Sequence, residues 1–167
     1  MPSLKIPMPI FEELREHMNR GPEEQVGFLY AAADGDCFTV TEFYRVPPEG
    51  FAAQSPQHLA LSDDVRAKVL SHAWSHGGGL VEAHSHPGAR SACFSPTDLS
   101  GFDEWVPHVR WRLQGAPYLA LVFAADDFDA LVWSRESPEP QPLDNLYAGE
   151  RKLRPSNLTS GFLLGKR

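Results

Sequence analysis

Two histidines and an aspartate lie close together in the sequence, in an order that suits a metal site. His84 and His86 stand at the end of the short apolar run 80–84, and Asp98 follows after a loop. Side chains two residues apart on a strand point to the same side, so both imidazoles can face one point. Asp98 falls in the first turn of the next expected helix, where its carboxylate can supply a third ligand. Two histidines and one carboxylate, with a fourth position left to water, form the ligand set of a catalytic zinc site, in which the pKa of that water falls toward about 7.

Each part of this pattern has an ordinary structural explanation when it is taken alone. A His-x-His pair on a strand is commonly two surface histidines. Ser95 and Asp98 flank Pro96 as a helix N-terminus requires, with a capping serine, a proline at the first helical position and an acid at the third. Their combination with an apolar strand and a loop favours a metal site, but the residues alone leave both interpretations open.

Three other residues could act as a nucleophile or bind a metal, but the sequence patterns around them are weaker. Cys93 lies between the two halves of the metal pattern, but its own segment places no basic group to lower the pKa of the thiol, so a free apolar residue is the simpler interpretation. His72 and His76 lie four apart on an expected helix without a His-Glu-x-x-His pattern. We expect both histidines on the surface.

The elements that position these residues follow from periodicity, caps and turn residues. The sequence predicts a helix at 10–18, a hairpin of strands 26–31 and 37–46, an irregular connection at 47–61, a helix at 62–77, a strand at 80–84, a loop at 87–95, a helix from Ser95, a hairpin of strands 118–123 and 128–133, and an extended tail from 134. The order α-β-β-α-β-α-β-β indicates a mixed α/β or α+β domain around a central sheet.

Composition narrows the class of protein. The chain has 167 residues and a net charge of −7, with five basic and no acidic residues from Arg151 onward, so residues 1–150 carry a net −12. An acidic body repels phosphates, so we expect no nucleic-acid partner. No apolar run approaches the roughly 20 residues that span a bilayer, and the two cysteines suggest no disulfide framework. We expect a cytoplasmic protein without membrane contact, organised as a catalytic domain at 1–134 and a Pro-rich, basic C-terminal extension at 135–167.

The pattern resembles the JAMM (MPN-plus, JAB) metalloprotease signature, in which His-x-His-Pro, a short loop and Ser-x-x-Asp follow a glutamate far upstream. The corresponding segments here are His84-Ser85-His86-Pro87, Ser95-Pro96-Thr97-Asp98 and Glu24-Gln25-Val26-Gly27-Phe28-Leu29. The resemblance spans roughly residues 9–134. One departure is visible, because eight residues separate His86 from Ser95 where the common form has seven. The resemblance implies an α/β fold, the MPN (JAB) domain, with a curved mixed β-sheet flanked by helices in a cytidine-deaminase-like architecture.

The resemblance also implies roles for individual residues. His84, His86 and Asp98 would ligate Zn2+, Glu24 would act as general base, and the Ser95 hydroxyl would steady the oxyanion. Glu82 shares a strand face with His84. It could be a ligand, a competing base, or the acceptor of an imidazole NH, and we favour the last.

The activity implied by the resemblance is that of a bacterial-type, zinc-dependent metallo-isopeptidase or peptidase. It would hydrolyse the bond after the C-terminal glycine of a ubiquitin-like protein, with that protein or its conjugate as partner and activating- and conjugating-enzyme-like proteins as possible further partners. The alternatives are a peptidase that matures a ubiquitin-like or sulfur-carrier precursor, and a non-catalytic MPN scaffold. A zinc deaminase would require His-x-Glu and Pro-Cys-x-x-Cys motifs, which the sequence lacks.

Overall fold

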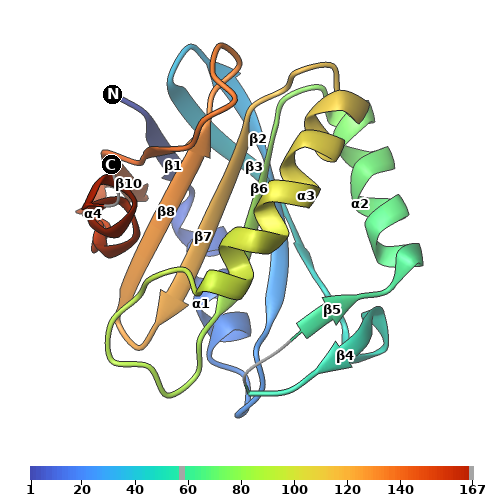
Figure 1. Ribbon diagram of the computed structural model, residues 1–167, viewed down its shortest axis with the longest axis vertical. Helices are drawn as coiled ribbons and strands as arrows, with labels where there is room; N and C mark the ends of the chain where they lie inside the picture. Colours follow the sequence, from blue (N-terminus) through green and yellow to red (C-terminus); the bar gives the residue numbers. More distant parts are fainter. Residues whose placement is uncertain (57–58, 166–167) are drawn as a thin grey trace.

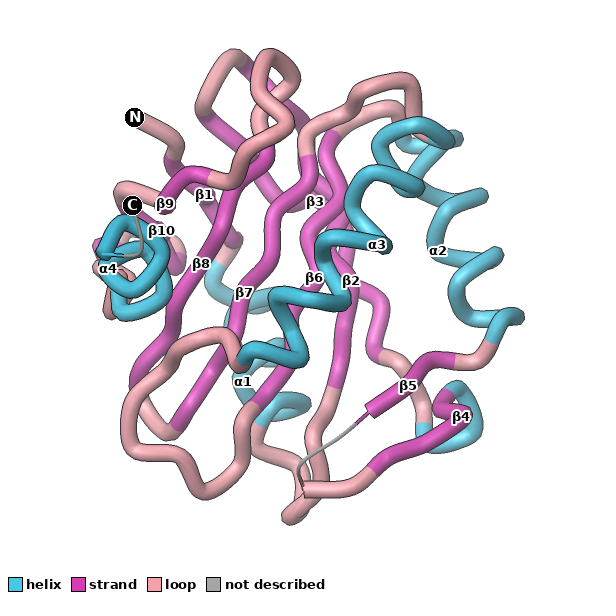
Figure 2. The backbone as a smooth tube through the Cα atoms, viewed as in Figure 1, coloured by secondary structure: helices cyan, strands magenta, loops and turns pink. Residues whose placement is uncertain are grey.

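The computed structural model describes residues 1–56 and 59–165 (Figures 1 and 2). The elements in chain order are β1 (Ser3–Ile6), α1 (Met8–Met18), β2 (Val26–Asp34), β3 (Cys37–Arg45), a 3-10 turn (Pro48–Gly50), β4 (Phe51–Gln54), β5 (Leu59–Leu61), α2 (Asp63–His76), β6 (Gly79–Ser85), α3 (Pro96–Arg112), β7 (Tyr118–Ala124), β8 (Asp127–Trp133), β9 (Gln141–Pro142), β10 (Asn145–Ala148), β11 (Arg151–Leu153) and α4 (Leu158–Gly165). Both predicted hairpins and the three predicted helices are confirmed.

In the described part of the chain, nine strands form one curved, mixed sheet in the order β11-β10-β1-β3-β2-β6-β7-β8-β9. The centre of the sheet is β2-β6-β7, in which β6 runs antiparallel to β2 and parallel to β7. Helices α2 and α3 lie side by side over one face, and α1 covers the other (Figure 1). The predicted fold class, a mixed α/β sheet flanked by helices, is confirmed.

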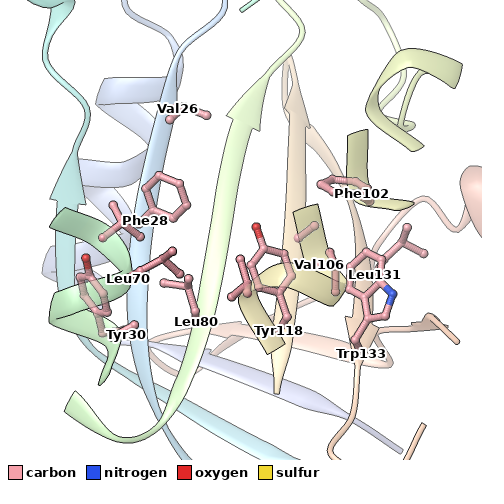
Figure 3. Packing of buried hydrophobic residues seen from close by; sticks show 14 of the residues in the cluster. Val26, Phe28, Tyr30, Leu70, Leu80, Phe102, Val106, Tyr118, Leu131 and Trp133 are labelled. Atoms are coloured by element: carbon pink, nitrogen blue, oxygen red, sulfur yellow. The ribbon is translucent and has the colours of Figure 1, made fainter. Parts of the chain in front are cut away.

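The strand alternation of β6 decides which face receives the site. Val81 and Ala83 pack in the core on the α1 face, whereas Leu80 packs in the core under α2 and α3. Figure 3 shows Leu80 and Tyr118 together in this second core. Because side chains two apart share a face, Glu82 and His84 point to the α2–α3 side with Leu80.

Helix ends are set by the residues that the sequence marked. The Ser62 hydroxyl accepts the Val65 N–H at 3.3 Å at the start of α2. Gly77 ends this helix in the left-handed conformation, with φ 80°, which glycine adopts without strain. Ser95 and Asp98 form a reciprocal capping box at the start of α3. The capping box therefore fixes the entry of the backbone into α3 at Ser95 and at Asp98, which is itself a predicted metal ligand.

The prediction of an extended tail from residue 134 is wrong. β10 pairs in parallel with β1, a strand that the sequence analysis did not find and that lies between β10 and β3, and α4 follows. Prolines 138, 140 and 142 precede β10, so they do not interrupt its hydrogen bonds, and apolar residues such as Leu143 and Leu146 are buried in the core. The division into domains at residue 134 stays a prediction, and Lys166 and Arg167 of the basic tail lie outside the described residues.

The predicted irregular connection at 47–61 also contains regular structure. β4 and β5 pair in an antiparallel, two-stranded sheet. Short strands of three or four residues with three prolines nearby lack the length that makes an alternating pattern visible in a sequence. Residues 57 and 58 of this segment lie outside the described part of the chain.

Candidate metal centre

His84 and His86 stand at the carboxyl end of β6, at the centre of the sheet. His84 is 2% exposed and pairs in register with Val26 of β2. One residue beyond the strand, the His86 N–H donates to the Phe123 carbonyl at 2.9 Å, which keeps the chain against β7. Ser85 points to the opposite face, where its hydroxyl accepts the Gln25 N–H at 2.9 Å. The His-x-His spacing therefore delivers two imidazoles to one side, as the sequence predicted.

The nitrogen and oxygen atoms of the three predicted ligands converge on one point. His84 Nε2 lies 3.2 Å from His86 Nε2, and Asp98 Oδ2 lies 3.2 Å from the first and 3.1 Å from the second. Tetrahedral bonds of about 2.0–2.2 Å place neighbouring ligand atoms about 3.3–3.6 Å apart, close to these separations. Two imidazole nitrogens also disfavour calcium and magnesium, which prefer oxygen. The His-His-Asp group could hold a transition-metal ion such as zinc.

Electrostatics in the metal-free chain couple the aspartate to the histidines. Burial acts against the charged form of Asp98, but the hydrogen bonds from His84, His86 and the Ser95 N–H outweigh burial and hold the pKa of Asp98 far below its usual range. Burial also opposes protonation of His84, and the bond to Asp98 outweighs it, so the pKa of His84 is raised. A metal ion must displace the shared protons, and metal binding would release them to solvent.

Glu24 is buried beside this triangle, although its position next to Glu23 is typical of an exposed acid. Its Oε1 lies 3.8 Å from His86 Nε2. The backbone is held from both sides, because the Glu24 N–H donates to the Ser55 carbonyl at 3.0 Å and its carbonyl accepts from Gln54 Nε2 at 2.9 Å. Glu24 is therefore within reach of a water molecule on the open side of the three ligand atoms.

Gly27, three residues after Glu24, has a packing role. A Cβ atom at this position would lie 2.6 Å from Cε2 of Phe43, whose ring packs against the core on the α1 face. A larger residue would push β2 or the ring away. The glycine of the Glu-x-x-Gly pattern thus allows the close packing of the strand that Glu24 precedes.

Ser95 lies at the edge of the same site, half-buried. Its hydroxyl oxygen accepts the Asp98 N–H at 3.1 Å, which leaves the hydroxyl hydrogen available to a ligand. Ser95, Asp98, His84 and Glu24 line one groove of about 700 Å³. The structure therefore brings together all five residues that the sequence analysis predicted as ligands, base and oxyanion donor, and their roles stay predictions.

Glu82 also lines this groove, but its hydrogen bond differs from the one we expected. Its Oε2 accepts the Tyr118 hydroxyl hydrogen rather than an imidazole NH, and the Tyr118 oxygen accepts Trp105 Nε1–H at 3.0 Å. Burial raises the pKa of Glu82, and burial together with Glu82 raises the pKa of Tyr118 well above 10. Sequence reasoning missed Tyr118 and Trp105, because aromatic residues among apolar neighbours carry no sign of a polar role.

The weaker candidates lie outside the metal triangle. The His72 imidazole pairs with Glu42, and His76 Nε2 lies 2.7 Å from the Thr41 hydroxyl. Cys93 is a free, exposed cysteine. Within residues 1–56 and 59–165, no helix is long and apolar enough to cross a membrane.

The fold and the site together define a mixed α/β domain with a His-His-Asp group suited to a metal. Residues 7–135 match the family described as prokaryotic homologs of the JAB domain, and the chain belongs to this family. Among solved structures, the solution structure of protein DSY2949 from Desulfitobacterium hafniense is similar, with 21% identity and a TM-score of 0.47 over 84% of this chain and 90% of that chain. No curated protein matches the chain in sequence.

Proposed function

We propose that this protein is a zinc-dependent peptidase or isopeptidase that cleaves after the C-terminal glycine of a ubiquitin-like protein. The observation that carries the proposal is the arrangement of Glu24. A buried carboxylate lies 3.8 Å from a ligand nitrogen but makes no part of the three-atom ligand group. An additional carboxylate at the open side of a metal site is what the hydrolysis of an amide by water requires.

The residues divide the work as follows. His84, His86 and Asp98 would hold the ion, which when bound supplies a Lewis acid for the scissile carbonyl and for water. Glu24 takes the proton of the attacking water and passes it to the leaving amine. Ser95 donates its hydroxyl hydrogen toward the developing oxyanion. No nucleophilic side chain is needed, which agrees with the position of Cys93 outside the groove lining.

The groove supports an extended peptide as substrate. Its lining includes the whole of β5, and within the described residues β5 pairs with β4 alone. The second edge of β5 therefore offers backbone groups to an extended chain. The C-terminal tail of a ubiquitin-like protein is such a chain. The groove is open at Gly101, because a Cβ atom on this residue would meet no atom within 4 Å. The acidic body suits a basic partner surface.

The test combines metal content with hydrolysis. We expect about one zinc ion per chain and cleavage of a ubiquitin-like protein fused through its C-terminal glycine to a peptide or to a lysine side chain. His84→Ala should abolish both, whereas His72→Ala, which removes an exposed histidine paired with Glu42, should change neither. Full activity in a zinc-free preparation would refute the proposal.

Two alternatives are resolved by the same assay. Cleavage of the linear fusion without the lysine conjugate would identify a peptidase that matures a ubiquitin-like or sulfur-carrier precursor. Zinc binding or substrate binding without cleavage of either would identify a non-catalytic scaffold. We favour hydrolysis because a scaffold has no use for the buried Glu24 beside the ligands.

A further inference from the structure

The loop between the two halves of the metal pattern is held by residues from the C-terminal segment. The Phe94 N–H donates to the Thr159 hydroxyl at 2.9 Å, and the Ser156 hydroxyl donates to the Ala92 carbonyl at 2.6 Å. Both loop residues are buried. Residues 156 and 159 lie beyond the segment 7–135 that matches the family. From within the matched segment, Asp127 Oδ2 also accepts the Ala92 N–H at 3.1 Å.

The hydrogen bonds of Thr159 and Ser156 to the loop, here called the clamp, start from a segment that a buried carboxylate holds against the sheet. Asp129 on β8 is fully buried, and its carboxylate accepts the Asn157 N–H at 3.2 Å and the Thr159 N–H at 3.0 Å at the start of α4. The Ser156 N–H donates to the Phe128 carbonyl at 2.8 Å. The C-terminal segment is thus fastened to the sheet before its hydroxyls reach the loop.

The clamped loop touches a predicted metal ligand directly. The centroid of the Phe94 ring lies 5.8 Å from the centroid of the His84 imidazole and 5.3 Å from that of the Phe102 ring on α3. Phe94 also precedes Ser95, whose backbone N–H donates to Asp98 Oδ2 at 2.9 Å. A shift of Phe94 would therefore move the packing of His84 and the capping box that orients Asp98.

We propose that Thr159 and Ser156 are positioning residues of the metal centre, acting through Phe94 and Ala92 to set His84, Ser95 and Asp98. The C-terminal segment is then a part of the site rather than an appendage. The inference uses the metal site of the proposed function, but it holds whether or not the bound metal hydrolyses a peptide.

The test needs only the full-length chain and Zn2+. Thr159→Val removes the acceptor at nearly constant volume, and Thr159→Ser keeps it. Ser160→Ala is the matched control, because Ser160 is the buried neighbour on α4 and its hydroxyl has no hydrogen-bond partner among the described residues. Amide hydrogen exchange in the metal-free protein reports the clamp, and Zn2+ affinity by chelator competition reports its effect on the site.

Thr159→Val should speed exchange of the Phe94 amide about tenfold, the value of one hydrogen bond. It should also weaken Zn2+ binding about threefold to tenfold. Loss of a group that contacts a metal ligand directly typically weakens binding about tenfold to a hundredfold, and Thr159 acts only through Phe94. Thr159→Ser should restore both, and Ser160→Ala should change neither. Ser156→Ala, which releases the Ala92 carbonyl in the loop and the Leu158 N–H in α4, should act in the same direction and covers the case in which Thr159→Val does not fold.

Three results would overturn the inference. They are unchanged Phe94 exchange, faster exchange with unchanged Zn2+ affinity, and an equal loss in Ser160→Ala. A wild-type protein that binds Zn2+ and shows the expected Thr159 effects, but cleaves no substrate, would refute the proposed function alone. Cleavage by the wild type with no effect of Thr159→Val would refute the positioning role alone.

Discussion

Replacement of Glu24 by glutamine tests the assignment of the general base most sharply. Glutamine keeps the size of the side chain and its place beside His86, but it cannot take a proton at neutral pH. Among residues 1–56 and 59–165, the other carboxylates of the site already have partners. Asp98 Oδ2 is already shared between two imidazoles and the Ser95 N–H, and Glu82 Oε2 is bonded to Tyr118.

The expected loss follows from this lack of a second base. General base catalysis contributes about 10²–10⁴ in rate, and we expect Glu24→Gln to lower kcat about a thousandfold, equal to about 4 kcal/mol of transition-state stabilisation. KM should change little, since Glu24 acts on water. Zinc content should stay near that of the wild type, because the ligand group of described residues consists of His84, His86 and Asp98.

Glu82→Gln is the matched control for this experiment, as a second isosteric change on a groove carboxylate. The Glu82 carboxylate already accepts the hydroxyl hydrogen of Tyr118 and is not positioned by a ligand nitrogen as Glu24 is, so we expect less than about a tenfold loss in kcat. The assay is cleavage of a ubiquitin-like fusion under saturating substrate, with metal content measured on the same samples. Turnover by Glu24→Gln within tenfold of wild type, or a larger loss in Glu82→Gln, would show that the base is misassigned.

Three further outcomes are expected. Asp98→Asn should weaken Zn2+ binding at least about a hundredfold, because the amide keeps the shape but loses the charge of a direct ligand; unchanged affinity in chelator competition would exclude Asp98 as a ligand. Burial lowers the pKa of His17, despite its hydrogen bond to the Val26 carbonyl, so the unfolded chain takes up a proton as pH falls below about 6.5 while the folded chain resists it. The wild type should therefore lose more stability than His17→Gln between pH 7 and pH 5, and equal losses in urea unfolding would contradict this. Gly27→Ala should cost about 1–3 kcal/mol through overpacking against Phe43, and Phe43→Leu in the same chain should recover part of it; a loss below about 0.5 kcal/mol would show that the ring yields freely.

The part of the site that the sequence predicted is the part encoded by short spacing. Strand alternation places His84 and His86 on one side, and the capping box places Asp98 in the first turn of α3, so a few neighbouring residues determine the ligand triangle. The central strands and three helices were predictable for the same reason. The central strands are short continuous apolar runs, α1 and α2 repeat apolar residues at helical spacing, and α2 and α3 have a cap at a defined offset.

The position of Glu24 required more than local pattern. Beside Glu23 it has the appearance of an exposed acid, and only the resemblance to a family placed it in the site. Its burial depends on Ser85, which ties residue 25 to the end of β6, and on residues 54 and 55, which hold its own backbone. These contacts join segments about 30 and 60 residues apart. No window of sequence contains them.

The C-terminal segment shows the same limit in a stronger form. Four prolines after residue 134 indicated an extended tail, and each does remove a backbone donor. The prolines do not determine the fate of the residues between and after them. β10 finds its partner in β1 at the other end of the chain, and the hydroxyls of Ser156 and Thr159 find theirs in the loop at 92–94. A serine or threonine near the start of a helix is ordinarily explained by capping. Nothing in the sequence therefore shows that its hydroxyl also bonds to the loop at 92–94. Residues that position a site act through contacts distant in the chain, whereas the His-His-Asp group is set by local geometry. For this reason the spacing predicted the candidate ligands, and the contacts that support them became visible only in the structure.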